Sequence, residues 1–173
     1  MKILFYICIF SISFTLTLLS FGDFHPRKAT NLPNIDRIVV HKSIRTLQLY
    51  ANNKLIKTYK IALGRNPIGH KQQEGDSKTP EGLYYITHHN PRSSYHLSLG
   101  ISYPNKQDKE NAQKHNVSAG GDIMIHGLPN YAPFFGAFHS LKDWTQGCIA
   151  VTNSEIEEIY TAVSDGTPIE ILP

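Results

Sequence analysis

Short apolar runs bounded by turn residues are the feature that most constrains the fold of this chain. Residues 45–50 alternate, with Leu47 and Leu49 on one face, and residues 55–63 alternate again after the turn sequence Ala-Asn-Asn-Lys. Period-two alternation on both sides of a turn predicts a β-hairpin. Further strand-length runs occur at 36–42, 81–88, 95–103, 122–127, 148–152 and 168–172. So many short strands predict a mainly β domain.

One helix is clearly predicted, at residues 154–164. Its apolar side chains recur at helical spacing and would share one face. Its start fits a capping box formed either by Ser154 with Glu157 or by Thr152 with Glu155. Gly166 stands where a left-handed residue often ends a helix. Residues 105–116 contain almost no apolar side chain and are either a surface helix or a polar loop. The apolar positions of the predicted helix are Ile156, Ile159, Tyr160 and Val163.

The N-terminus indicates export. Residues 3–22 carry no charged side chain and follow Lys2. Such a segment is typical of a signal peptide, here with a cut after Gly22, or of an uncleaved anchor. We therefore expect residues 1–22 to be a signal peptide or anchor, 23–35 a linker and 36–173 the folded domain. The domain would lie in the periplasm or cell envelope, either free or anchored to the inner membrane.

Composition excludes other classes of partner. The chain is 40% hydrophobic and 18% charged, with a net charge of +3, which favours a folded domain over disorder. No cluster of Lys and Arg is interleaved with aromatic residues, so nucleic acid is not an expected partner. We expect a monomer that uses no cofactor.

Cys148 is the candidate nucleophile. The chain has two cysteines, and Cys8 falls in the expected export segment, so Cys148 is the only thiol of the exported part. Gly147 before it allows a tight turn and leaves an amide N–H for a developing oxyanion. A buried, inert core cysteine is the alternative interpretation.

His126 is the candidate general base. It ends the run at 122–127, directly before Gly127, and could meet Cys148 at the rim of a sheet. We expect an imidazolium at His126 to lower the pKa of a partly exposed Cys148 thiol. A purely structural histidine is the alternative.

Separated motifs together resemble the catalytic domain of the L,D-transpeptidase (YkuD-type) family. They are Thr79-Pro80-Glu81-Gly82, His126-Gly127 and Thr145-Gln146-Gly147-Cys148, in this order. The segments Asn90-Pro91, Tyr103-Pro104-Asn105 and 144–153 resemble most its murein L,D-transpeptidase-like branch. The resemblance covers residues 36–173. It implies a β-sandwich or barrel with one or two helices.

The resemblance also implies a mechanism. Cys148 would be the nucleophile, His126 its base, and the Gly127 carbonyl the group that orients the imidazole. The amides of Gly147 and Cys148 would form the oxyanion hole. The enzyme would cleave peptidoglycan stem peptides between the diamino acid and D-alanine, through an acyl-enzyme. An amine of another stem peptide or of an anchored lipoprotein, or water, would then resolve that intermediate.

Substrate contacts are expected from Gln146, Trp144 and His96. Gln146 stands where many family members have His, and Ala150 stands where many have Arg or Asn. These departures leave the thiol chemistry intact but leave the usual cross-linking specificity open.

Three alternative functions remain from the sequence. The first is a hydrolytic variant, either an L,D-carboxypeptidase or an amidase that releases peptidoglycan-linked lipoprotein. The second is a peptidoglycan-binding module without catalysis. The third is a metal hydrolase using His88, His89, His96 or His126. No HExxH motif is present, and His88 and His89 would point to opposite faces of a strand, so we expect no metal site.

Overall fold

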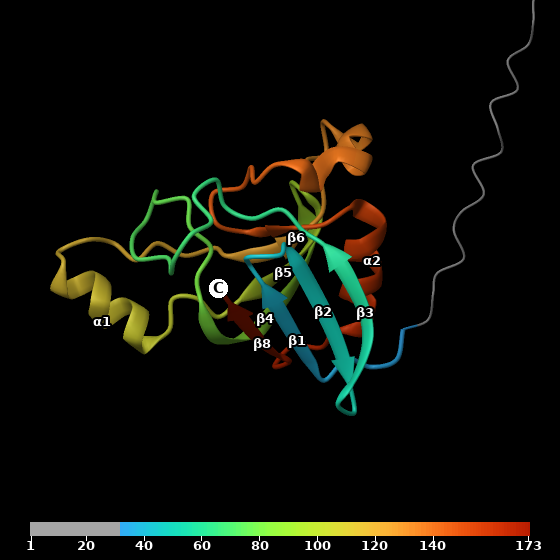
Figure 1. The fold of residues 1–173 in the computed structure, drawn as a ribbon, viewed down its shortest axis with the longest axis horizontal. Helices are drawn as coiled ribbons and strands as arrows, with labels where there is room; N and C mark the ends of the chain where they lie inside the picture. The colour runs from blue at the N-terminus through green and yellow to red at the C-terminus, as the bar shows by residue number, and fades with distance from the viewer. Residues whose placement is uncertain (1–31) are drawn as a thin grey trace, which may run out of the picture.

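A computed structural model describes residues 32–173 as one curled sheet with helices on its outside (Figure 1). The expected signal peptide or anchor at 1–22 lies outside the described residues. The eight strands follow the order β3-β2-β1-β8-β4-β5-β6-β7, which confirms a mainly β fold. Their bounds are β1 Arg37–His41, β2 Thr46–Ala51, β3 Lys54–Lys60, β4 Gly82–Ser93, β5 His96–Ile101, β6 Met124–His126, β7 Ile149–Ala150 and β8 Pro168–Leu172.

The predicted hairpin is confirmed. Strands β2 and β3 pair antiparallel, and Asn52 and Asn53 make the turn between them with φ of 51° and 61°. Asparagine tolerates this left-handed conformation better than most residues, which explains the Asn-Asn sequence at the turn. Leu47 and Leu49 both face the core and are fully buried.

The curl brings the two ends of the sheet together. Just beyond β3, Ala62 forms an antiparallel bridge with Ala150 of β7, with N–O distances of 3.0 and 2.8 Å. The next segment continues this contact, because Gly64 bridges Thr145. The chain from β3 into its following loop therefore lies against the segment that precedes β7.

Helix α1, Lys106–Lys114, settles the polar segment as a helix. Asn105 and Asp108 form a capping box at its start. The same Asp108 carboxylate accepts a 3.0 Å hydrogen bond from the Tyr84 hydroxyl and lies 3.1 Å from the His70 imidazole. A nearly all-polar helix is thus held through its cap rather than through an apolar face.

Helix α2, Asn153–Ala162, begins with the capping box of Thr152 and Glu155, not that of Ser154 and Glu157. Its buried Ile156 and Ile159 pack against β5 and β6, as predicted. Gly166 does not end the helix. Val163 follows the last turn in an extended conformation, and Gly166, with φ of 87°, lies in the turn before β8.

Two boundaries differ from expectation. Strand β4 is longer than the run expected at 81–88, because it continues to Ser93 and register shifts in its pairing with β5 accommodate Pro91. The last residue of the expected linker, Ile35, is 1% exposed and its N–H donates to the Ala162 carbonyl at 2.9 Å. No helix in residues 32–173 is long and apolar enough to cross a membrane.

Candidate active site

Parallel strands β6 and β7 bring His126 and Cys148 to one side of the sheet. His126, the last residue of β6, pairs with Ala150 of β7, and Cys148 lies two residues before Ala150. Because side chains alternate along a strand, positions two apart share a face, so Cys148 and His126 are diagonal neighbours. Both line a cleft of about 490 Å³.

The His126 imidazole is fixed on both sides. Its Nδ1 lies 2.7 Å from the Gly127 carbonyl oxygen, so Nδ1–H donates and Nε2 is the acceptor nitrogen of the neutral ring. The rings of Tyr95 and Trp144 lie 4.5 and 5.6 Å from it, centroid to centroid. The imidazole is only 4% exposed, and this burial lowers its pKa to about 4 despite the opposing Gly127 hydrogen bond.

The Cys148 thiol is half-buried, and its Sγ lies 3.4 Å from the Asp122 carbonyl. Burial raises the pKa of the thiol above its ordinary value, and the nearby Asp122 carboxylate adds to this. A backbone hydrogen bond from Met124 and the charge of Lys71 oppose the effect only in part. The expected acidic thiolate beside an imidazolium is therefore wrong, and the resting pair consists of a thiol and a neutral imidazole.

Glycine is the only residue type that fits at position 147. Its φ is 132°, and a Cβ there would lie 2.6 Å from the Lys78 carbonyl oxygen. Its N–H donates to the Thr145 hydroxyl at 3.1 Å, and that hydroxyl donates to the Cys148 carbonyl at 2.7 Å. Of the two amides expected to form an oxyanion hole, that of Gly147 is thus already engaged.

The long loop at 64–82 forms another wall of the cleft. Lys71 is buried, and its ammonium donates to the Asp76 carboxylate at 2.8 Å. Asp76 also accepts hydrogen bonds from the backbone N–H groups of Gln72, Gln73 and Lys78. Burial raises the pKa of the Asp76 carboxyl, but these bonds and the one from Lys71 outweigh burial, so the pKa is lowered. The loop is therefore held as a fixed wall beside the thiol.

Thr79 and Gly64 explain the Thr-Pro-x-Gly motif structurally. The Thr79 side chain is fully buried and accepts the Gly64 N–H at 3.1 Å, while its carbonyl accepts the buried Lys42 ammonium at 2.8 Å. A Cβ on Gly64 would lie 2.1 Å from the Ser77 carbonyl oxygen and 3.1 Å from Gly147 Cα. The motif thus packs the loop against the residue before the nucleophile.

The expected substrate-binding residues separate into two groups. Gln146, exposed, and Trp144, half-buried, both line the cleft. His96 does not, because its Nε2 lies 2.6 Å from a Glu157 carboxylate oxygen on α2. Ala150 is fully buried opposite Ala62 and is not a cleft residue.

Several cleft residues were not predicted from the sequence. Arg65 is exposed in the cleft, and its side chain forms no hydrogen bond or ion pair with any described residue. The length and Gly/Pro content of the loop at 64–82 were the only signal for it. Lys71, Glu74, Tyr95 and Asp122 are further examples.

The histidines proposed for a metal site are dispersed. His89 lies 2.7 Å from the Asp165 carboxylate, near the end of α2, and does not line the cleft. Within residues 32–173, no group of three or more His, Cys, Asp or Glu side chains is arranged to hold a metal ion.

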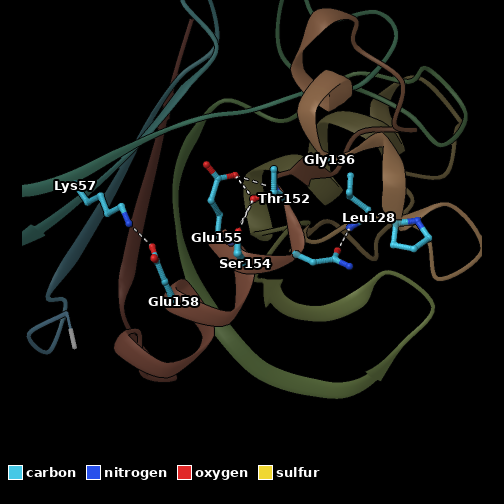
Figure 2. A pocket seen from close by; sticks show the side chains of 9 residues that line it. Lys57, Leu128, Gly136, Thr152, Ser154, Glu155 and Glu158 are labelled. Carbon is cyan, nitrogen blue, oxygen red and sulfur yellow. Dashed lines mark hydrogen bonds and ion pairs between the residues drawn. The ribbon is translucent and has the colours of Figure 1, made fainter. Parts of the chain in front are cut away.

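A second cavity, of about 580 Å³, shares no lining residue with the cleft (Figure 2). Its polar side chains bond to other groups of the fold. Lys57 pairs with Glu158, Thr152 with Glu155, and the Asn153 side chain accepts the Leu128 N–H. The cavity contains no thiol or imidazole, so we place the candidate chemistry in the smaller cleft.

Residues 35–171 match the family model described as the L,D-transpeptidase catalytic domain, YkuD. The chain belongs to this family. The protein of Escherichia coli K12 named "Putative L,D-transpeptidase YafK" is 32% identical over 133 residues, which are 73% of this chain and 46% of YafK. This chain therefore spans about half the length of that relative.

Solved structures agree with this assignment. Helical cell shape determining protein Pgp2 of Campylobacter jejuni is 26% identical with a TM-score of 0.58, over 84% of this chain and 51% of Pgp2. Bd1075 of Bdellovibrio bacteriovorus is 27% identical with a TM-score of 0.56, over 82% of this chain and 48% of Bd1075. The expected family and its mainly β fold are thereby confirmed.

Proposed function

We propose that this domain is a cysteine acyltransferase that acts on peptidoglycan stem peptides at the bond between the diamino acid and D-alanine. One observation carries the proposal. His126 at the end of β6 and Cys148 just before β7 line one cleft, and the Gly127 carbonyl fixes the imidazole with Nε2 as its proton acceptor. This arrangement supplies a nucleophile and a base for acyl transfer.

The neutral resting pair determines the first step. Cys148 Sγ attacks the carbonyl carbon of the diamino acid while its proton passes to His126 Nε2. The resulting imidazolium is stabilised by the Gly127 carbonyl, which takes the place of the carboxylate in other triads. The oxyanion is received by the Cys148 N–H, which has no acceptor among residues 32–173.

The second step releases D-alanine. The tetrahedral intermediate collapses, the C–N bond breaks, and the imidazolium returns its proton to the departing amine. A thioester on Cys148 remains. An amine or water, deprotonated by the same imidazole, then attacks the thioester and restores the thiol. The acceptor alone decides between transfer and hydrolysis.

Arg65 suits a substrate carboxylate. Its backbone is fixed, because its N–H donates to the Thr145 carbonyl at 3.0 Å, while its guanidinium is exposed in the cleft. A guanidinium binds carboxylates in a two-pronged geometry. The carboxylate of the D-alanine leaving group, or that of the diamino acid, is the partner we propose.

Incubation of the full chain with disaccharide-tetrapeptides, read by mass spectrometry, tests this function. We expect the wild-type chain to release D-alanine. The Cys148→Ala variant should release none, and the rate of release should fall by roughly 10²–10⁴-fold in His126→Ala. Cross-linked products would indicate transfer, and tripeptides alone would indicate hydrolysis. Binding without turnover would favour the non-catalytic module. Activity abolished by a chelator would favour the metal hydrolase.

We also propose that the domain works in the periplasm or cell envelope, as a monomer. The uncharged run at residues 3–22 supports export. Sequencing the N-terminus of the protein from the cell envelope tests this. Asp23 would indicate cleavage, and an intact Met1 on a membrane-bound protein would indicate an anchor. Recovery of the intact chain in the cytoplasm alone would contradict export.

A further inference from the structure

Four large apolar side chains are exposed on one short segment, residues 131–141, which contains the 3-10 helix η1, Pro133–Leu141. This segment, orange in Figure 1, projects from the top of the molecule. A group of exposed apolar side chains of this size usually marks an interaction site. We call these residues the η1 surface: Tyr131, 86% exposed, Phe134, 75%, Phe138, 63%, and Leu141, 78%.

The η1 surface is continuous with the catalytic cleft. Tyr131 and Trp144 line the cleft and also an adjoining cavity of about 240 Å³. Phe138 and Lys142 line that cavity on its other sides. A ligand held in the cleft beside Cys148 can therefore extend along Tyr131 onto the η1 surface.

The adjoining cavity also contains an unsatisfied polar group. His139 lines it and is 8% exposed, and its Nδ1 has no hydrogen-bond partner among the described residues. Its Nε2 lies 3.9 Å from Glu155, too far for a hydrogen bond. Buried polar atoms normally find partners, so a ligand rich in hydroxyl or amide groups would fit this place.

The geometry of the proposed substrate brings such a ligand to this place. A stem peptide is joined to its sugar through its first residue, and the bond attacked by Cys148 follows the third. The three residues between the sugar and that bond span roughly 10 Å when extended. The sugars must therefore pass close to the rim of the cleft. Sugar rings have apolar C–H faces that stack on aromatic rings, and hydroxyl and acetamido groups that need hydrogen bonds.

We propose that the η1 surface binds the glycan strand of peptidoglycan while its stem peptide occupies the cleft. The proposal rests on the proposed function for its substrate. Phe134 and Phe138 supply the stacking faces, and the adjoining cavity receives a polar substituent of the sugar.

A double variant, Phe134→Ala with Phe138→Ala, tests the proposal in the full chain. We compare kcat/KM for a free tetrapeptide and for the same tetrapeptide on uncross-linked glycan strands. We expect the variant to lose about tenfold on the glycan-linked substrate, since each aromatic contact contributes about 0.5–1.5 kcal/mol. Activity on the free peptide should be unchanged. Tyr85→Ala, which removes a side chain 49% exposed on β4, is the matched control and should change neither value.

A binding assay separates this inference from the proposed function. Wild-type chain should co-sediment with glycan strands from which all peptides have been removed, and the double variant should not. Failure of the wild-type chain to bind these strands would overturn the inference even if the enzyme cleaves peptides. Equal loss of activity on both substrates would also overturn it. A double variant that still binds glycan, but no longer binds phosphatidylglycerol vesicles or no longer self-associates, would also overturn the inference.

Discussion

The Nδ1 atom of His126 lies 2.7 Å from the carbonyl oxygen of Gly127, the next residue in the chain. A carbonyl oxygen only accepts, so the proton of the neutral ring is on Nδ1 and the lone pair is on Nε2. Burial keeps the ring neutral at pH 7 by lowering its pKa to about 4. His126 is therefore a base in the resting state, without an ion pair to Cys148.

The acid limit of activity follows from this pKa. A base must be unprotonated, so activity is lost as pH falls through the pKa of His126. We expect the acid limb of kcat/KM near pH 4, well below the ordinary histidine value of about 6.5. A pH profile on a free tetrapeptide measures it. An acid limb near pH 6.5 would show that the imidazole is solvated or paired with a thiolate.

The pH midpoint for alkylation of Cys148 should be raised, whereas that of an activated cysteine is lowered. Burial raises the pKa of Cys148, so alkylation by iodoacetamide should rise with a midpoint above the free-thiol value of about 8.5. The rate is best measured in a Cys8→Ser background, which leaves one thiol, with N-acetylcysteine as the reference. A midpoint below that of the reference would contradict this prediction and would indicate a thiolate–imidazolium pair.

Stability should fall in acid for the same physical reason. Unfolded histidine takes up a proton near pH 6.5, whereas folded His126 resists protonation until about pH 4. The unfolded state binds more protons between these values, so folding stability decreases as pH falls, by about 3 kcal/mol at pH 4 from this residue. Urea unfolding at pH 7 and pH 4 measures the loss. The His126→Asn variant has no titrating group at this position, so its loss of folding stability between pH 7 and pH 4 should be smaller than that of the wild type by about 3 kcal/mol.

Gly147 and Gly166 form a matched pair. Both have positive φ, 132° and 87°, but an added Cβ would lie 2.6 Å from the Lys78 carbonyl at Gly147 and would meet nothing within 4 Å at Gly166. We expect Gly147→Ala to abolish activity, because it pushes the loop at 64–82 away from the nucleophile. Gly166→Ala should keep full activity and cost about 1 kcal/mol of stability from its backbone alone. Equal effects of the two variants on turnover would contradict the role of the close contact.

The helix face can be tested by Ile159→Asp. Ile159 is fully buried between α2 and the sheet, so the variant buries an unpaired carboxylate and should lose more than about 3 kcal/mol. Ser154→Asp, at an exposed position of the same helix, should stay within about 0.5 kcal/mol. Thermal melting of both variants measures the difference. An Ile159→Asp variant that melts like the parent would show that this face is not the packed one.

Local patterns predicted what local interactions decide. The β2–β3 hairpin and the buried face of α2 follow from periodicity and turn residues within each segment. The positions of His126 and Cys148 were predicted because each stands at the end of a recognisable strand. The choice of capping box was not, since Ser154 and Thr152 fit the pattern equally well and only the folded chain separates them.

The electrostatics of the site depend on long-range packing and were predicted with the wrong sign. Tyr95 and Trp144 enclose His126 from two distant segments, and no local pattern indicates that burial. His96 was expected in the cleft, but it lies at the start of β5 with φ of 67° and pairs with Glu157 of α2. Arg65 reaches the cleft only because the curled sheet joins its ends.

A covalent intermediate on Cys148 tests the proposed mechanism. Intact-protein mass spectrometry during turnover of a disaccharide-tetrapeptide should show the enzyme heavier by the substrate minus D-alanine. The added mass should map to the peptide that contains Cys148 and should be absent in Cys148→Ala, which should release no D-alanine. Release of D-alanine by Cys148→Ala, or an acyl group on another residue, would contradict the mechanism.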